Sequence, residues 1–339
     1  MPANLADCNV LVTGGAGFIG SHLCERLLAS DAKVTCLDNM STGKLSNLSQ
    51  ARRNINFKVV RGDILDLKTV KKVVRGVDVI YHLAAKVGVK RYVENPSDVI
   101  RTNVLGTHNL LEACRPLSIE RFVFASTSEI YGKNPSLPLH EGSDRVLGPP
   151  QIDRWCYSTS KSVDEHLCNA YYRRYGLPAV ILRYFNSYGP RQDSSDYGGV
   201  VSIFMRRALA NQPPRVHGDG QQTRSFTFIS DVIDATVNAC LRKEVIGEAV
   251  NIGNPIETNI LELANTIIRI AQRQRELKPE LISYDKFYGQ WYEDIRRRVP
   301  DISKAKRLLG FTPKVTLEEG LRKTFDWYRQ QFGSRSKRC

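Results

Sequence analysis

The chain has 339 residues, about twice the length of a typical single domain, so we expect one large domain or two closely joined ones. Its composition, 42% apolar and 25% charged, is that of a globular protein and excludes the disordered, collagen-like and coiled-coil classes. No stretch approaches the roughly 18 apolar residues of a membrane span. The first residues lack the basic-then-apolar order of a signal peptide, and the eight cysteines form no C-x-x-C pair. We therefore expect a reduced, cytoplasmic protein without a metal site, a disulfide framework or a membrane partner.

The net charge of +14 comes from 49 Lys and Arg residues against 35 Asp and Glu residues. A surplus of this size attracts polyanions or an anionic small substrate. Most basic residues lie in short dispersed pairs that are typical of solvated surface, and only Arg296–Arg298 and the last residues are clustered. The charge therefore does not decide the function by itself.

In chain order, short runs rich in Val, Ile and Phe predict six strands, at residues 8–14, 33–39, 54–63, 77–85, 121–127 and 179–186. Apolar spacing at three and four residues predicts helices at 18–30, 66–75, 97–115 and 158–175. Strands buried by helices on both faces form a parallel sheet, so this is an α/β, doubly wound (Rossmann) fold. Residues 229–254, a helix followed by a strand, are expected to return to the same sheet.

After residue 186 the pattern loosens, and Gly, Pro and Ser crowd residues 187–199. This indicates a smaller C-terminal α/β substrate lobe. We predict a dinucleotide-binding domain from residues 1–185 plus 229–254. The substrate lobe would comprise residues 186–228 plus 255–332, followed by a basic tail at 333–339.

The run VLVTGGAGFIG, residues 10–20, follows the first predicted strand and opens the first helix. Gly14 allows the tight turn, Gly17 lets a pyrophosphate approach the backbone, and Gly20 lets helix and strand pack closely. Asp38 ends the second strand, where a carboxylate accepts hydrogen bonds from a ribose diol and repels a 2′-phosphate. This pattern favours NAD over NADP. Asp63, after the third strand, is a candidate for the adenine amine or a turn-capping residue.

Tyr157 and Lys161 lie four residues apart in WCYSTSK, so they share one face of the predicted helix. An ammonium beside a phenol favours the phenolate, which can take a hydroxyl proton while hydride leaves to nicotinamide. The strand end ASTSEIYG places Thr127, Ser128 and Glu129 at the carboxyl edge of the sheet, where doubly wound folds bind ligands. These three elements together predict a dehydrogenase-like catalytic centre.

As a set, GGAGFIG, Asp38, HLAA (82–85), STSEIYG, YSTSK and RYFNSYGPR resemble the extended short-chain dehydrogenase/reductases that modify nucleotide sugars. The resemblance spans essentially the whole chain. It implies a homodimer built through helices 97–115 and 158–175, with Thr127 and Tyr157 at the sugar carbon-4 hydroxyl. It also implies NAD as the cofactor, held by Gly14, Gly17, Phe18, Ile19, Gly20, Asp38, Asn39, Asp63, Ile64, Leu83, Ala84, Tyr157 and Lys161.

The same resemblance implies a UDP-sugar substrate. Its contacts would come from Tyr92, Thr127, Ser128, Arg154, Asn186, Arg215, Arg224 and Tyr292. Arg224 would supply a two-pronged donor for phosphate, although a surface arginine is the simpler alternative. Nucleic acid is not an expected partner.

Family members share oxidation at carbon 4 and then diverge into epimerases, 4,6-dehydratases and decarboxylases. Glu129 stands where common 4-epimerases have an uncharged residue, and Ser128 replaces the Asp of typical dehydratases. GPPQIDRWCYSTSK and FYGQWYEDIRRRVPDIS resemble segments of UDP-glucuronate decarboxylases, which would place Arg298 beside the uronate carboxylate. The five catalytic candidates are therefore Thr127, Tyr157, Lys161, Glu129 and Arg298.

Three residues depart from the decarboxylase pattern: Lys86, Val87 and Tyr184. UDP-glucuronate decarboxylation is the favoured reaction, and UDP-sugar 4-epimerisation or 4,6-dehydration are the alternatives. A more distant alternative is a non-catalytic NAD- or RNA-binding relative, against which the intact Thr127, Tyr157 and Lys161 argue. Glu129 could also be a structural carboxylate, and Arg298 one of three exposed arginines.

Overall fold

A computed structural model describes residues 4–289 and 291–333 of the chain. In this part, seven strands form one parallel sheet in the order β11-β6-β5-β4-β1-β2-β3. The six predicted strands are all present, and the predicted return of the chain is confirmed because β11 pairs with β6 in parallel. The strands are β1 (Asn9–Thr13), β2 (Lys33–Asp38), β3 (Phe57–Arg61), β4 (Val79–His82), β5 (Arg121–Thr127), β6 (Ala179–Tyr184) and β11 (Ala249–Ile252).

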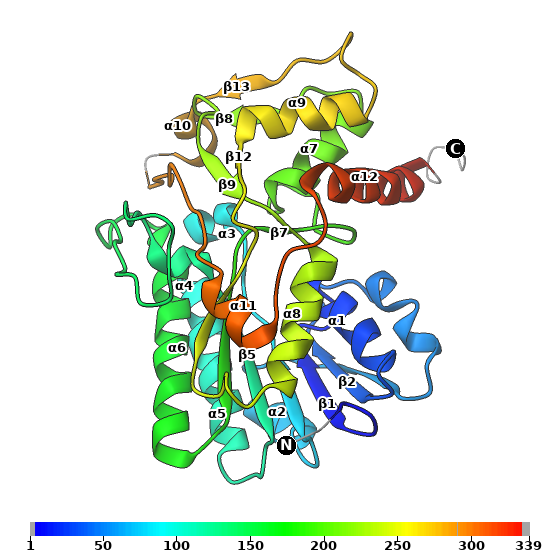
Figure 1. The fold of residues 1–339 in the computed structure, drawn as a ribbon, viewed down its shortest axis with the longest axis vertical. Coiled ribbons are helices and arrows are strands. Elements are labelled where there is room, and N and C mark those ends of the chain that lie inside the picture. The colour runs from blue at the N-terminus through cyan, green and yellow to red at the C-terminus, as the bar shows by residue number, and fades with distance from the viewer. Residues whose placement is uncertain (1–3, 290, 334–339) are drawn as a thin grey trace.

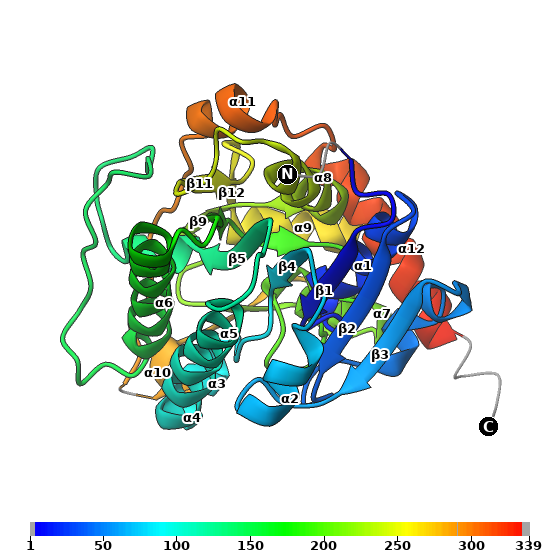
Figure 2. The same cartoon turned by 90° about the horizontal axis from the view of Figure 1, so that it is seen from below.

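Helices cover both faces of this sheet (Figures 1 and 2). Alternate residues of β1 enter different cores: Val10 and Val12 pack on one face, and Leu11 packs on the other. One face is covered by α1 (Phe18–Leu28) and α8 (Ile229–Leu241). The other face is covered by α2 (Leu67–Val73), α5 (Gly106–Cys114) and α6 (Trp155–Tyr175). The doubly wound α/β fold is therefore confirmed.

The predicted helix at residues 97–115 is interrupted. It consists of α4 (Pro96–Ile100), a π-helical turn η3 (Arg101–Leu105) and α5. The π turn carries Asn103, whose side chain accepts from the backbone N–H of Lys86 at 2.8 Å and donates to the Ser160 hydroxyl at 3.1 Å. Such turns are frequent at functional sites, and apolar spacing alone does not reveal them. The helix α3 (Val89–Glu94) precedes this segment.

Most of the later elements form a smaller lobe at the carboxyl edge of the sheet, at the top of Figure 1. Its strands form three two-stranded pairs, β7 with β10, β9 with β12 and β8 with β13. The strands are β7 (Ser187–Tyr188), β8 (Arg215–His217), β9 (Thr223–Ser225), β10 (Thr227–Phe228), β12 (Glu257–Asn259) and β13 (Glu280–Ile282). The later helices are α7 (Val200–Leu209), α9 (Ile260–Ile270), α10 (Tyr284–Tyr288), α11 (Ser303–Leu309) and α12 (Leu317–Gly333).

The domain boundaries given above stay a prediction, and the expected basic tail lies, from residue 334 onward, outside the described residues. None of the described helices combines the length and apolar character needed to cross a membrane. The seven cysteines of the described residues are unpaired.

Candidate active site

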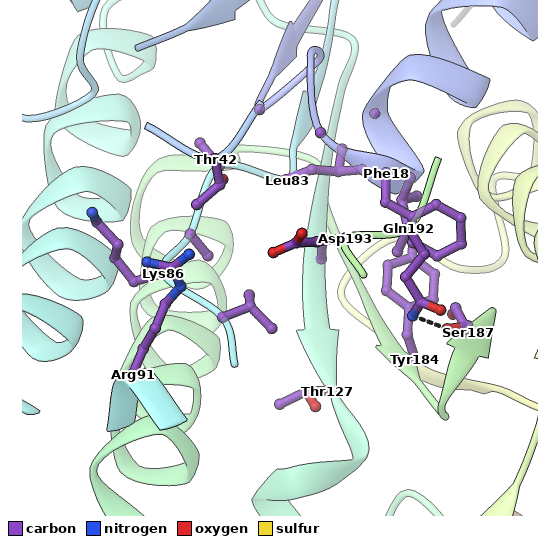
Figure 3. A pocket seen from close by; sticks show the side chains of 18 of the residues that line it. Phe18, Thr42, Leu83, Lys86, Arg91, Thr127, Tyr184, Ser187, Gln192 and Asp193 are labelled. Atoms are coloured by element: carbon purple, nitrogen blue, oxygen red, sulfur yellow. Dashed lines mark hydrogen bonds between the residues drawn. The ribbon is translucent and has the colours of Figure 1, made fainter. Parts of the chain in front are cut away.

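The carboxyl ends of the central strands open onto a cavity of about 420 Å³. Figure 3 shows it from close by, with Lys86 and Arg91 on one wall, Ser187 and Gln192 on the opposite wall, and Thr127 between them. Most predicted site residues line this cavity. They are Gly14, Gly17, Phe18, Ile19, Gly20, Asp38, Asn39, Ile64, Leu83, Ala84, Tyr92, Thr127, Ser128, Glu129, Tyr157, Lys161, Asn186 and Arg298.

The turn between β1 and α1 requires glycine. Gly14 has φ +70°, and a Cβ on it would lie 2.8 Å from the backbone nitrogen of Ala84. A Cβ on Gly20 would lie 2.2 Å from the carbonyl oxygen of Gly14, so α1 and β1 pack closer than any side chain allows. α1 begins without a side-chain cap, and its first turn lines the cavity. A helix N-terminus in this position suits a phosphate.

Asp38 lies at the end of β2 and is mostly buried. Its carboxylate accepts from the backbone N–H groups of Ala16 at 2.9 Å and Met40 at 2.8 Å. Burial raises the pKa of Asp38, and these two hydrogen bonds oppose the rise. Each oxygen keeps a free lone pair for a ribose hydroxyl. Together with the glycine cradle, this carboxylate fits the NAD implied by the resemblance.

Asp63 does not line the cavity. Its carboxylate accepts from the Asn39 side chain at 2.8 Å and from the backbone N–H of Leu65 at 2.8 Å. Asn39 itself lines the cavity. In this structure Asp63 acts on the cavity through Asn39, and direct contact with an adenine stays a prediction.

Tyr157 and Lys161 lie on the buried face of α6. The Tyr157 ring stacks on Tyr92, with centroids 4.5 Å apart and planes 7° from parallel. The Lys161 Nζ lies 4.1 Å from the centre of the Phe124 ring, on β5. Contacts with neighbouring side chains fix the positions of Tyr157 and Lys161, as is required of catalytic groups.

The pKa of Tyr157 is raised in this structure, not lowered as the sequence suggested. Burial is the main cause and the Glu129 charge adds to it, whereas the hydroxyls of Thr127 and Tyr92 oppose the rise. Burial also lowers the pKa of Lys161. These neighbours do not favour the phenolate, and its stabilisation by the Lys161 ammonium stays a prediction.

Glu129 lies between two buried arginines. Its carboxylate accepts from Arg298 Nη1 at 2.8 Å and from Arg154 Nη2 at 3.2 Å. Burial alone would raise the pKa of Glu129, but the charges of Arg154 and Arg298 outweigh it and hold the pKa at about 2. Glu129 is thus ionised at neutral pH and forms the centre of an ion cluster.

Arg298 is 2% exposed, so the alternative of an exposed arginine is wrong. Its Nη1 donates to Glu129 and, at 3.3 Å, to the Ser128 hydroxyl. Its Nε and Nη2 are buried without a hydrogen-bond partner among the described residues. These two nitrogens form one edge of the guanidinium, the edge that binds a carboxylate with two parallel hydrogen bonds.

Four predicted substrate residues do not line the cavity. Arg154 donates to the Tyr292 hydroxyl at 2.9 Å, and Tyr292 donates to Asp294 at 3.0 Å. Arg224 donates to Asp294 at 2.8 Å, and half-exposed Arg215 pairs with Glu280 at 3.3 Å. Arg154, Arg224 and Tyr292 thus form one network behind Glu129, and their contact with a substrate stays a prediction.

The cavity also contains residues that sequence reasoning missed as site residues. Arg191 ends the motif RYFNSYGPR and pairs with Glu25 of α1 at 2.8 Å, so the motif itself carried a signal. Arg91 lies 4.3 Å over the ring of Tyr197. That pair joins segments about a hundred residues apart, and no local pattern indicates it. Among the described residues, no group of three or more His, Cys, Asp and Glu residues is placed to hold a metal ion.

The family model described as GDP-mannose 4,6 dehydratase matches residues 11–324. The chain is 40% identical to a UDP-N-acetyl-alpha-D-glucosaminuronate decarboxylase from Bacillus cytotoxicus, over 94% of this chain and 97% of that protein. It is 37% identical to UDP-glucuronic acid decarboxylase 1 of Xenopus tropicalis, over 95% of this chain and 72% of that protein.

Among solved structures, the chain is similar to UDP-glucuronic acid 4-epimerase from Bacillus cereus, in complex with UDP-glucuronic acid and NAD. The TM-score is 0.86 at 34% identity, and the match covers 95% of this chain and 99% of the other. The solved epimerase thus shares this fold, and the two decarboxylases are 37% and 40% identical to this chain in sequence.

Replacing Glu129 with Gln should cost about 3 kcal/mol of stability at pH 7, because two buried arginines lose their shared counter-ion. Since the folded pKa of Glu129 is depressed from 4.5 to about 2, its contribution is full above pH 4.5 and is lost as the pH falls toward 2. Urea unfolding of both proteins across this range should show the difference shrinking.

Glu257→Gln is the matched control. Its carboxylate pairs with Arg297, which is 58% exposed, at 2.7 Å. A surface pair of this kind contributes little, so the control should stay close to the wild-type stability. A Glu129→Gln deficit that is small, or the same at every pH, would contradict the charge argument.

Proposed function

Because the chain belongs to the extended short-chain dehydrogenase/reductase family of nucleotide-sugar decarboxylases, epimerases and dehydratases, we propose that it is an NAD-dependent UDP-glucuronate decarboxylase, a lyase that first oxidises the sugar at carbon 4. The observation that carries the choice of substrate is Arg298, which lines the same cavity as Thr127 and Tyr157 and has two buried guanidinium nitrogens without a hydrogen-bond partner among the described residues. A uronate differs from a neutral hexose by a carboxylate, the group that this edge binds best.

The ion cluster around Glu129 carries a positive surplus. Arg154, Arg224 and Arg298 contribute three charges, and Glu129 and Asp294 return two. A buried charge without a partner is costly, so an anion that binds where the cluster meets the cavity would stabilise it. A neutral hexose leaves that surplus uncompensated, which favours a uronate.

When bound, NAD supplies the hydride acceptor for oxidation at carbon 4. Tyr157 would take the proton of the carbon-4 hydroxyl, with the Thr127 hydroxyl beside it to orient the substrate oxygen. Lys161 would keep its ammonium near the phenolate and the nicotinamide ribose. This division of roles follows the resemblance and is consistent with all three side chains lining the cavity.

In a 4-keto uronate the carboxylate is β to the ketone. Cleavage of the bond between carbons 5 and 6 releases carbon dioxide and leaves the electron pair as an enolate over carbon 5, carbon 4 and its oxygen. Arg298 would hold the carboxylate before cleavage and face the enolate afterwards. Glu129, ionised with a pKa of about 2, cannot supply a proton near neutral pH and instead orients Arg298.

The second candidate is 4-epimerisation of the same uronate. A solved relative of this chain is a UDP-glucuronic acid 4-epimerase. Such an enzyme also needs an arginine that binds the carboxylate. The cavity therefore favours a uronate over a hexose as the substrate, but it distinguishes decarboxylation from epimerisation less sharply.

The proposal includes a reducing, cytoplasmic location, supported by the unpaired cysteines Cys8, Cys24, Cys36, Cys114, Cys156, Cys168 and Cys240. Detection of the protein chiefly in an oxidising compartment would contradict this location.

We expect the purified protein to convert UDP-glucuronate with loss of carbon dioxide, detected by mass spectrometry, and to leave UDP-glucose unchanged. Arg298→Lys should lower kcat/KM by about 10²-fold, since an ammonium cannot replace a two-pronged donor. Arg297→Lys is the control, because Arg297 is next to Arg298 in the sequence but its side chain is 58% exposed. A product of unchanged mass would indicate the epimerase, and conversion of UDP-glucose alone would refute the uronate proposal.

Replacing Tyr157 with Phe should lower turnover by ~10²–10⁴-fold, the usual contribution of a general base. Binding of NAD, measured by calorimetry, should be preserved because the Phe ring can keep the stack on Tyr92. Near-normal turnover in this variant would show that another group takes the proton.

We further propose a homodimer through α4, η3, α5 and α6, the helices of residues 97–115 and 158–175, where Ile100, Leu105, Val163, Tyr172 and Tyr175 are exposed. Sedimentation velocity should give a dimer, and a Leu105→Lys, Val163→Lys double variant should shift it to monomer. Ile256→Lys, at a residue 68% exposed on the other lobe, should leave the dimer intact. A monomeric wild-type protein would contradict this arrangement.

A further inference from the structure

Asp164 is a buried carboxylate that neither the sequence motifs nor the proposed reaction uses. It follows Tyr157 and Lys161 on α6 at the spacing i, i+4, i+7, so the three side chains share one face of the helix. The Asp164 side chain is 0% exposed. Burying a carboxylate in this way is costly unless something nearby compensates the charge.

Lys161 provides the compensating charge. Its Nζ lies 3.8 Å from Asp164 Oδ2, and neither carboxylate oxygen has a hydrogen-bond partner among the described residues. The Thr107 hydroxyl, on α5, favours the ionised form of Asp164, and it also pairs with His82 Nε2 at 3.0 Å. Without the ammonium, Asp164 would be a buried charge without a counter-ion.

The other groups around Asp164 cannot take over this role. His82 is held neutral, because burial and the Lys161 charge lower its pKa to about 3. Glu165 is engaged by Arg183, 2.7 Å away. Burial and the neighbouring carboxylates raise the pKa of the Cys168 thiol, which therefore stays neutral.

Lys161 depends on Asp164 in return. Burial lowers the pKa of Lys161, and Asp164 is the main group that opposes this. Apart from that carboxylate, the ammonium contacts the Phe124 ring face at 4.1 Å. A ring face and a carboxylate on two different elements thus confine the ammonium between them.

We propose that Asp164 is a positioning residue for the carbon-4 oxidation, whose carboxylate is the buried counter-ion that keeps the Lys161 ammonium charged and in place beside Tyr157. This role rests on the proposed function only for the identity of the substrate group that is oxidised. The ion pair itself belongs to the protein before any substrate binds.

The pH dependence follows from the two charges. Burial raises the pKa of Asp164 to about 7, although Lys161 and Thr107 oppose the rise. Above that pH the carboxylate is ionised and extends the charged range of Lys161 upward. Removing Asp164 takes away the largest contribution that opposes burial, so Lys161 loses its proton at a lower pH. Asp164 also raises the pKa of Tyr157. Its removal therefore lowers that pKa and does not by itself abolish Tyr157 as a base.

The test is to measure the Lys161 pKa directly in Asp164→Asn and in the wild type. NMR of protein labelled with ¹³C at the lysine ε-carbon reports each ammonium, and Lys161→Met identifies the signal. We expect the Lys161 pKa to fall by about one unit or more in Asp164→Asn, the shift that an opposite charge at this range produces. The alkaline limb of the kcat profile for NAD reduction should move down by the same amount.

Asp234→Asn is the matched control, because it removes a carboxylate 3.6 Å from Arg26 that is 52% exposed. Neither the Lys161 pKa nor the alkaline limb should move in it. If Asp164→Asn does not fold, Asp164→Ser removes the same charge with less volume. Asp164→Glu restores a carboxylate and should recover part of the lost range.

An unchanged Lys161 pKa in a folded Asp164→Asn or Asp164→Ser protein would overturn the proposal, as would a loss of stability without any shift of the alkaline limb. If the wild type fails to oxidise any UDP-sugar while the Lys161 pKa still falls in the variant, the proposed function fails and the ion pair stands.

Discussion

The active cavity depends on one buried interaction, the Glu129 carboxylate held between Arg154 and Arg298. Glu129 follows β5, Arg154 precedes α6, and Arg298 lies in the segment before α11. Because Glu129 is the shared counter-ion of both arginines, its carboxylate ties the three segments together, and its removal leaves buried positive charge uncompensated. The wall that would receive the substrate thus forms only when the C-terminal segment packs against the sheet edge.

Backbone contacts deliver Arg298 to that wall. The carbonyl of Arg296 accepts from the N–H of Thr223 at 2.9 Å, and the carbonyl of Val299 accepts from the N–H of Leu139 at 2.8 Å. The chain is therefore anchored on both sides of Arg298, once to the smaller lobe and once to the loop after β5. This explains why the neighbours Arg296 and Arg297 face solvent while Arg298 is buried.

The sequence predicted the parts of the molecule that local patterns encode. The glycine turn, Asp38 and the pair Tyr157–Lys161 lie within single strand–helix units, and the structure brings them to one cavity. Arg154 was expected at the sugar and Tyr292 at the nucleotide, which stays a prediction, and the structure adds a hydrogen bond between these two side chains across 138 residues. No periodicity reports such a pairing, and no apolar spacing distinguishes the π turn at 101–105 from ordinary helix.

Two carboxylates, Glu129 and Asp164, act on Tyr157, and their environments shift their own pKa values in opposite directions. Glu129 faces two arginines and has a pKa of about 2, whereas Asp164 faces one lysine and has a pKa of about 7. Burial raises the pKa at both sites, and at Glu129 the charges of two arginines outweigh it, whereas at Asp164 one lysine does not. On the substrate side the cations outnumber the carboxylates by one, so one bound anion would balance the charge. On the cofactor side one cation faces one carboxylate, so the charge is already balanced. The site can therefore accept the charge of a uronate at one end while the ammonium beside Tyr157 keeps its own counter-ion.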